Sequence, residues 1–249
     1  MFEIIVPTYN AGDNLGALIE SVRAQSVRKW RMHITCDECV ESFEKANEIV
    51  EKLGDHRINV FFNKERKYAL KNIYDTIQEQ VKDENAIIAI IDGDDQLCDN
   101  QCLEYAAKSY EDVVVEDVLC EKGCQILWTG HKWDDRELNV SQFLPPNENP
   151  YTYPWVSSHL RTFKKSLLDQ INVKNFQDDT GAWFKRGYDQ ALMLPLLYYA
   201  YKNSLKACYL PRICYIYNHK ASATPKNEHT GGKLEESIAT FLRHRGYIE

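Results

Sequence analysis

Three carboxylates stand close together directly after an apolar segment, in the sequence Asp92-Gly93-Asp94-Asp95. The preceding residues, 86–91, are only alanine and isoleucine, which is typical of a strand buried on both faces of a parallel sheet. Ligands of open α/β sheets bind beyond the carboxyl ends of the strands, so we expect these acids to face a ligand-binding crevice. Carboxylates this close repel one another, and a hard divalent cation relieves the repulsion. The segment therefore predicts a metal or nucleotide site.

The same acidic segment has a simpler alternative, a turn that caps the next helix, because aspartate and glycine are common turn formers. A calcium-binding EF-hand loop fits less well than either reading. That loop needs a ligand at its fifth position and glycine at its sixth, where this chain has Gln96 and Leu97.

Polar residues also follow two other predicted strands. The strand Phe2–Val6 leads into Pro7-Thr8-Tyr9-Asn10, and the strand Trp30–Thr35 leads into Asp37. We expect these residues to line the same crevice as Asp92, because parallel strands end at one edge of the sheet. The chain has no Gly-x-Gly-x-x-Gly after its first strand and no Gly-x-x-x-x-Gly-Lys-Ser/Thr. A dinucleotide or triphosphate site is therefore not expected.

The elements that would position these residues alternate between strand and helix. Apolar periodicity predicts strands over Phe2–Val6, Trp30–Thr35, Ile58–Phe62 and Ala86–Ile91. Helical spacing predicts helices over Asn14–Gln25, Glu41–Leu53, Tyr68–Val81 and Leu103–Tyr110. Four successive strand–helix units predict an α/β fold with a parallel, doubly wound sheet flanked by helices.

The second half of the chain is less regular. It predicts strands over Gln125–Gly130 and Ile213–Tyr217, and helices over Arg161–Ile171, Asp189–Lys202 and Lys233–His244. A loop rich in proline and asparagine, residues 144–154, separates the sheet-forming half from a half richer in tyrosine and tryptophan.

Composition narrows the class of protein. Of the 249 residues, 44% are hydrophobic and 27% charged, as in a soluble globular protein. A net charge of −7 argues against a general nucleic-acid binder, so a small-molecule partner is favoured. The apolar run Ala191–Tyr201 is too short to span a bilayer and contains Pro195, so it predicts a buried helix. With no signal peptide recognised, we expect a cytoplasmic protein without a membrane span.

Eight cysteines raise the question of disulfides or zinc. Their spacing lacks the regular framework of a small secreted scaffold, so we expect free thiols in a reducing cytosol, with zinc binding as the alternative. Three close pairs occur, Cys36/Cys39, Cys98/Cys102 and Cys120/Cys124.

The order and spacing of the motifs resemble inverting glycosyltransferases of the GT-A fold, sequence family 2. The matching pieces lie within roughly the first hundred residues and are Ile4-Ile5-Val6-Pro7-Thr8-Tyr9-Asn10, Asp37, Ala69-Leu70-Lys71-Asn72 and Asp92-Gly93-Asp94. The resemblance implies a single GT-A (Rossmann-like) domain over residues 1–249 with a mostly parallel central sheet. Residues 1–110 would bind a nucleoside diphosphate sugar, and residues 111–249 would bind a carbohydrate acceptor and end in a helix.

The resemblance assigns the nucleotide to the first two strand ends. Pro7, Thr8, Tyr9 and Asn10 would hold it, with Thr8 and Tyr9 covering uracil, and Asp37 would accept a hydrogen bond from the ring N–H. The alternatives are a turn with an ordinary surface aromatic and an acid at a helix N-terminus.

The resemblance also implies a metal-assisted diphosphate site. Lys71 would reach the base or the diphosphate, and Asp92 and Gly93 would contact the ribose or the metal. Asp94 would bind Mn²⁺ or Mg²⁺, with His219 as a further metal or phosphate ligand. Such an ion stabilises the negative charge that grows on the departing diphosphate. The alternative for Lys71 is a solvated side chain on a helix surface.

The general base is assigned to Asp189 by its place at the start of a helix about one hundred residues after the Asp-x-Asp motif. Tyr188 stands where members of the family usually have Glu. An N-cap for the following helix is the alternative role of Asp189.

Four more residues are assigned to the acceptor side. His159 and Arg161 belong to a His-x-Arg-Thr-Phe segment resembling one in some bacterial and viral members, and Asp179 and Trp183 precede the base. Stacking on a sugar ring and packing in the core are both open to Trp183.

The sequence thus predicts a metal-dependent inverting glycosyltransferase that moves a sugar from a nucleoside diphosphate donor, expected to be UDP-linked, to a glycan hydroxyl. A sugar-nucleotide nucleotidyltransferase is the alternative enzyme, although its glycine-rich N-terminal signature is missing. A non-catalytic module that binds sugar nucleotides or glycans is the alternative outside enzymes.

Overall fold

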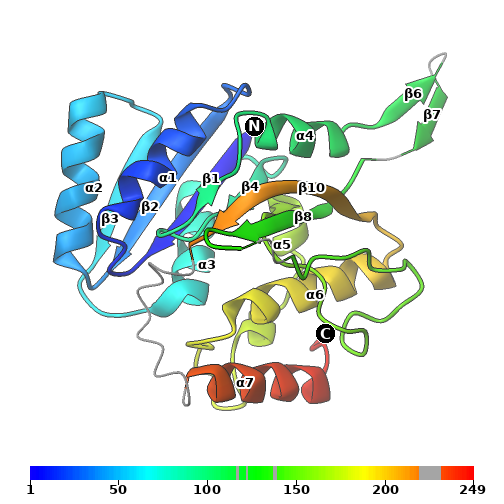
Figure 1. Cartoon of the computed structure of the whole chain (residues 1–249). Coiled ribbons are helices and arrows are strands. Elements are labelled where there is room, and N and C mark those ends of the chain that lie inside the picture. Colours follow the sequence, from blue (N-terminus) through cyan, green and yellow to red (C-terminus); the bar gives the residue numbers. More distant parts are fainter. Residues whose placement is uncertain (116–117, 122, 137–138, 219–230) are drawn as a thin grey trace.

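In the computed structural model, which describes residues 1–115, 118–121, 123–136, 139–218 and 231–249, an eight-stranded sheet forms the centre of the molecule (Figure 1). Its strands follow the order β3-β2-β1-β4-β9-β8-β10-β5. The first four are all parallel, namely β3 (Ile58–Asn63), β2 (Trp30–Asp37), β1 (Phe2–Thr8) and β4 (Ile87–Ile90). The predicted α/β fold with a mostly parallel sheet is confirmed.

The other half of the sheet is mixed. β9 (Arg161–Lys164) is antiparallel to both β4 and β8 (Ile126–Trp133), and β10 (Ala207–Tyr217) runs parallel to β8. The short strand β5 (Gln96–Leu97) closes the order antiparallel to β10. A separate hairpin, β6 (Val113–Val115) with β7 (Val118–Glu121), projects from the sheet (Figure 1).

The predicted helix Arg161–Ile171 is wrong over its first part. Residues 161–164 form β9, and only α5 (Lys165–Leu168) is helical. Apolar side chains at 163, 167 and 168 gave the helical spacing, but the slot between β4 and β8 pairs the backbone of residues 161–164 on both sides. The tertiary setting therefore overrides the local preference.

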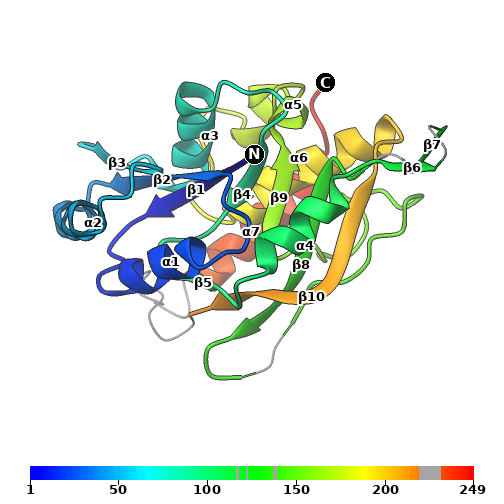
Figure 2. The same ribbon diagram turned by 90° about the horizontal axis from the view of Figure 1, so that it is seen from above.

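Helices cover both faces of the sheet (Figure 2). Successive residues of β1 point to opposite faces, because Ile4 and Val6 belong to one apolar cluster and Ile5 to the other. The first cluster is covered by α1 (Asn14–Arg23), α2 (Val40–Leu53) and α4 (Cys102–Ser109). The second is covered by α3 (Tyr68–Gln80), α5, α6 (Tyr188–Lys202) and α7 (Gly231–Arg245), near the 3₁₀ turn η1 (Val173–Phe176).

The predicted buried helix is α6, whose apolar residues from Ala191 to Leu197 are buried on all sides. The predicted C-terminal surface helix is α7, and it is more than a surface element. Its Leu242 is buried, and its Arg243 donates to the carbonyls of Pro150, Tyr151 and Tyr153 at 2.7–3.3 Å. The helix thereby holds the loop of residues 144–154 against the core.

Among the described helices, none has the length and apolar character needed to cross a bilayer.

The expectation of free thiols is wrong for one pair. Cys124, two residues before β8, is disulfide-bonded to Cys208 in the neighbouring β10, 84 residues later. The sequence did not suggest this pair, because adjacency in the sheet and not spacing along the chain brings the two sulfurs together. Among the described residues, Cys36, Cys39, Cys98, Cys102 and Cys214 are free thiols.

Candidate active site

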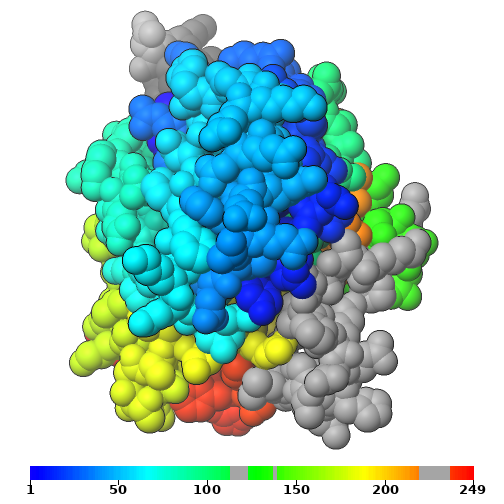
Figure 3. All heavy atoms as spheres, turned by 90° about the vertical axis from the view of Figure 1, so that its left-hand side faces the viewer, coloured from blue at the N-terminus to red at the C-terminus, as the bar shows by residue number. Residues whose placement is uncertain are grey.

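One cavity of about 320 Å³ opens where β1, β2 and β4 end. Both halves of the chain contribute to its wall, and Figure 3 shows the first half meeting the yellow segment that leads into α6. Predicted site residues in the wall from the first half are Pro7, Thr8, Tyr9, Asp37, Asp92, Gly93 and Asp94. Those from the second half are His159, Arg161 and Asp189.

Other predicted site residues lie away from this wall. Lys71 pairs with Asp75, and its Nζ lies 4.9 Å from the ring centroid of Trp183. Trp183 packs against Tyr74, with ring centroids 5.1 Å apart, so its ring serves the core. Asp179 is in an exposed turn.

Asn10 is exposed beside the cavity in a left-handed conformation, with φ of 52°. The prediction for His219 falls outside the described residues.

Gly93 is at the point where β1 and the turn after β4 come closest. A Cβ added there would lie 2.5 Å from Thr8 Oγ1, and the Gly93 N–H donates to the Pro7 carbonyl at 3.2 Å. Only glycine permits this approach without displacing Thr8. Gly93 therefore sets the distance between two of the strand ends that form the cavity.

Asp37 is buried at the end of β2, and its carboxylate organises the start of a helix. Its two oxygens accept hydrogen bonds from the backbone N–H groups of Lys67 and Tyr68, both at 2.8 Å. These residues begin α3, so the carboxylate satisfies N–H groups that have no partner within the helix. Oδ1 also accepts from the Asn63 side-chain amide at 3.4 Å, whereas Oδ2 keeps a second lone pair. Asp37 therefore combines a structural contact with a place in the cavity wall.

An arginine that the sequence did not mark covers the first strand end. The Arg66 Cζ lies 3.3 Å from the Tyr9 ring centroid, and both residues line the cavity. Stacking of a guanidinium on an aromatic ring fixes both planar groups. In the sequence, only its place after the third predicted strand could have marked Arg66 as a site residue.

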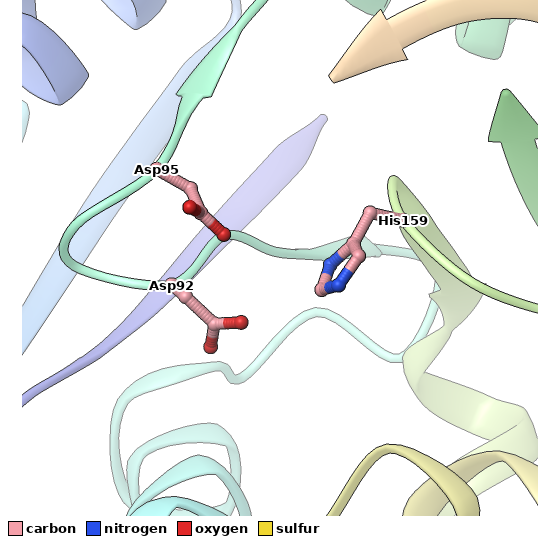
Figure 4. A group of neighbouring side chains, drawn as sticks. All are labelled: Asp92, Asp95 and His159. Carbon is pink, nitrogen blue, oxygen red and sulfur yellow. The ribbon is translucent and has the colours of Figure 1, made fainter. Parts of the chain in front are cut away.

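Three polar side chains come together at the acidic turn after β4. Asp92, Asp95 and His159 have oxygen and nitrogen atoms within 4.8 Å of one another, and their side chains converge on the space between them (Figure 4). Burial raises the pKa of Asp92, although the nearby charge of Arg161 opposes the shift. Burial and the charges of Asp92 and Asp94 raise the pKa of Asp95 well above its ordinary value. A cation among these carboxylates would favour their ionised forms.

Asp95 was expected to face the crevice, but the structure ties it to the sheet. It accepts hydrogen bonds from the Tyr215 hydroxyl and the Asn218 N–H, both at 2.7 Å. The Tyr215 hydroxyl also accepts from the Asp92 N–H at 3.1 Å. The end of β10 therefore fixes the acidic turn from the opposite half of the sheet.

Arg161 is a fully buried guanidinium beneath the cavity. Its Nη2 donates to His159 Nδ1 at 2.8 Å and to the Tyr188 hydroxyl at 3.1 Å, and it lies 3.9 Å from Asp92 Oδ2. The Tyr188 hydroxyl in turn donates to Asp92. Tyr188 therefore connects α6 to the acidic turn.

Asp189 is the second residue of α6 and faces the cavity. The N-cap position belongs to Gly187, which has a left-handed φ of 60°. The alternative role of Asp189 as an N-cap is therefore wrong. Its carboxylate in the first turn is compatible with the positive end of the helix dipole and is placed to act on a ligand.

The donor set fits a hard cation at its carboxylates. Asp92 and Asp94, which line the cavity, and Asp95, the next residue of the same turn, offer oxygens, the ligands that Mg²⁺ and Mn²⁺ prefer. The sequence placed all three carboxylates beside a cation, with Asp94 as the assigned ligand and Asp92 as a contact to the ribose or the metal. The structure brings the carboxylates of Asp92 and Asp95 within 4.8 Å of each other.

A model of the family described as "Glycosyl transferase family 2" matches residues 3–172 of the chain. This stretch contains the acidic turn and the first strand ends, but it ends before α6 begins. Among curated proteins, no sequence matches this chain significantly.

Solved structures with the same fold include S. aureus TarS 1–349 in complex with UDP-GlcNAc, with a TM-score of 0.64 at 17% identity over 100% of this chain and 68% of that one. The mannosyltransferase PcManGT from Pyrobaculum calidifontis, in complex with GDP-Man and Mn²⁺, has a TM-score of 0.63 at 15% identity over 98% of this chain and 63% of that one. A second TarS 1–349 structure has a TM-score of 0.56 at 16% identity, over 87% and 60%. The chain thus spans about two thirds of the length of these structures.

Proposed function

Because the chain belongs to glycosyl transferase family 2, we propose that it transfers a sugar from a nucleoside diphosphate sugar to a carbohydrate hydroxyl with inversion at the anomeric carbon. One observation carries this proposal. The strand ends of the first half and Asp189 of the second half face each other across a single cavity. A transferase needs this arrangement, because donor and acceptor must meet at one reacting carbon.

The donor nucleoside is assigned to the end formed by Thr8, Tyr9, Asp37 and Arg66. The stacked pair of Tyr9 and Arg66 offers a flat surface for a base, and Asp37 offers an acceptor for a ring N–H. UDP-GlcNAc and GDP-Man accompany two structures of the same fold, which supports a nucleoside diphosphate sugar as the donor class. Within that class we propose a UDP-linked sugar.

A divalent cation, Mn²⁺ or Mg²⁺, is assigned to the carboxylates of Asp92, Asp94 and Asp95. When bound, it would stabilise the negative charge of the departing diphosphate. Mn²⁺ accompanies GDP-Man in the mannosyltransferase of the same fold, which supports this choice.

Asp189 is assigned the role of general base. Its carboxylate would take the proton of the acceptor hydroxyl while that oxygen attacks the anomeric carbon from the face opposite the diphosphate. A carbon–oxygen bond to the acceptor forms as the bond to the diphosphate breaks, so the configuration inverts. Arg161 and Tyr188 hold Asp92 in place beneath the reacting groups.

Thermal shift with a panel of nucleotide sugars tests the donor proposal. We expect UDP-sugars to raise the melting temperature in the presence of Mn²⁺ and to lose this effect in chelator. A ligand at about one hundred times its dissociation constant stabilises a protein by about 2.7 kcal/mol. Asp94→Ala should abolish the shift, and Glu79→Gln, an exposed carboxylate on α3, is the matched control.

The outcomes separate the alternatives. Equal shifts in chelator, or in Asp94→Ala, would contradict the metal assignment. Binding of UDP-sugars without transfer or donor hydrolysis would indicate a non-catalytic module, and formation of a nucleotide sugar from a nucleoside triphosphate and a sugar phosphate would indicate a nucleotidyltransferase.

A further inference from the structure

The ring of His159 is held in one plane at the edge of the cavity. It stacks on Tyr215, with centroids 4.5 Å apart and an interplanar angle of 16°, and on Tyr217 with centroids 5.7 Å apart. The residue lines the cavity, so one edge of the ring reaches the ligand space. Stacking from β10 therefore fixes the plane of the ring.

The contact with Arg161 determines which nitrogen carries the proton. Arg161 Nη2 lies 2.8 Å from His159 Nδ1, and a guanidinium offers only donors. Nδ1 must therefore accept, which excludes both the Nδ1–H tautomer and the doubly protonated ring. The single ring proton is on Nε2.

This tautomer has a consequence for the cation site. A histidine nitrogen binds a metal through its lone pair, and in His159 the Nδ1 lone pair is engaged by Arg161 while Nε2 carries hydrogen. The ring lies within 4.8 Å of the Asp92 and Asp95 carboxylates but does not offer them a third ligand. Its Nε2–H has no acceptor among the residues that the structure describes, and the ring borders the cavity.

We propose that His159 donates a hydrogen bond from Nε2 to an oxygen of the donor's diphosphate, that Arg161 fixes this tautomer, and that His159 is not a metal ligand. The choice of the diphosphate rests on the proposed function. A diphosphate neutralised by the cation at Asp92 and Asp95 would bring its oxygens beside this N–H. The sequence had assigned His159 to binding of the carbohydrate acceptor. Its position beside the acidic turn instead favours a contact with the sugar-nucleotide donor.

The tautomer is measurable without any variant. Two-bond ¹H–¹⁵N correlation spectra of the full chain labelled at its histidines should show His159 with a protonated Nε2 and a bare Nδ1 at neutral pH. The pattern should stay the same when Mg²⁺ is added. A protonated Nδ1, or loss of the Nε2 proton on adding Mg²⁺, would overturn the inference. Comparison with His159→Gln assigns the signal among the seven histidines.

Binding measurements test the two roles separately. His159→Asn keeps an acceptor near the Nδ1 position and loses the Nε2 donor, whereas the amide of His159→Gln reaches the Nε2 position. We expect both variants to bind Mn²⁺, followed by electron paramagnetic resonance, within about twofold of wild type. Asp92→Asn, which alters a proposed ligand, should lower the affinity for Mn²⁺ at least about tenfold, equivalent to about 1.4 kcal/mol of binding free energy.

Calorimetry with UDP, GDP and uridine in Mg²⁺ then locates the hydrogen bond. His159→Asn should lower the affinity for UDP or GDP, whichever the wild type binds, by about tenfold. His159→Gln should recover part of the loss, and the affinity for uridine should not change. Equal UDP or GDP affinity in His159→Asn, or a loss that extends to uridine, would overturn the diphosphate assignment while the proposed function stands. If wild type binds neither UDP nor GDP, the proposed donor function fails, and the assignment of the hydrogen bond to the diphosphate fails with it.

Discussion

Replacing Asp189 by Asn should separate catalysis from folding. Among the described residues the Asp189 side chain has no hydrogen-bond partner, and the N-cap of α6 is Gly187. The change therefore removes no hydrogen bond among them. It removes a favourable charge at the helix N-terminus, worth about 0.3–1 kcal/mol, and the attraction of that charge to Arg161. It also relieves repulsion with the half-buried Asp92, whose pKa is raised in part by the Asp189 charge after the larger effect of burial. We expect the free energy of unfolding to stay within about 1 kcal/mol of wild type.

The effect on turnover should be far larger. An amide cannot take the proton of the acceptor hydroxyl, and general base catalysis contributes about 10²–10⁴ in rate. That range corresponds to about 2.7–5.4 kcal/mol in the activation free energy. Transfer would be followed by release of the nucleoside diphosphate, with donor affinity measured in parallel by calorimetry and stability by urea denaturation.

Asp178→Asn is the matched control for Asp189→Asn. Asp178 closes an exposed turn by accepting from the N–H groups of Thr180 and Ala182, at 2.9 and 3.0 Å, and does not line the cavity. The control should keep full transfer activity. Transfer in Asp189→Asn within tenfold of wild type would remove Asp189 from the role of base, and a parallel loss of donor binding would show that it holds the donor instead.

Three further predictions concern the frame of the site. Gly93→Ala should lower the free energy of unfolding by about 1–3 kcal/mol in urea, because its Cβ would lie 2.5 Å from a hydroxyl of β1. Gly16→Ala, with 3.9 Å of clearance in α1, should be neutral or stabilise by up to about 1 kcal/mol. Burial and then the charge of Arg161 lower the pKa of His131 from 6.5 to about 4, so its contribution is present above pH 6.5 and is lost as the pH falls through 4. That loss is worth about 3 kcal/mol, and His131→Phe should flatten the fall in stability measured between these pH values. Thiol titration of the denatured protein should find two fewer reactive thiols without reductant than with it, because Cys124 and Cys208 are joined.

Contrary results would be informative in each case. Equal stability of both glycine variants would mean that β1 and the acidic turn separate easily. An unchanged pH profile in the histidine variant would assign acid unfolding to other groups. Equal thiol counts would show that the chain folds with the two sulfurs reduced.

The main strands and helices of the first half of the chain could be predicted from its sequence. Buried parallel strands such as β4 are continuous apolar runs, and helices such as α3 repeat their apolar residues at helical spacing, so neighbouring residues carry the signal. The place of Asp37 and Asp92 at one edge followed from a general property of parallel sheets. The strand boundaries differ from the predictions by no more than two residues in this half.

The side-chain contacts that complete the site could not be predicted from the sequence. Tyr188 meets Asp92 across 96 residues of chain, and Tyr215 meets Asp95 across 120. Neither pair leaves a periodic pattern in the sequence, because the partners lie on different elements and depend on how the sheet is ordered. Likewise the residues of β9 form a strand because β4 on one side and β8 on the other pair with their backbone. Local periodicity thus determined the elements and their polar ends, and only packing between distant segments decided how their side chains combine, since hydrogen bonding and burial depend on distance in space.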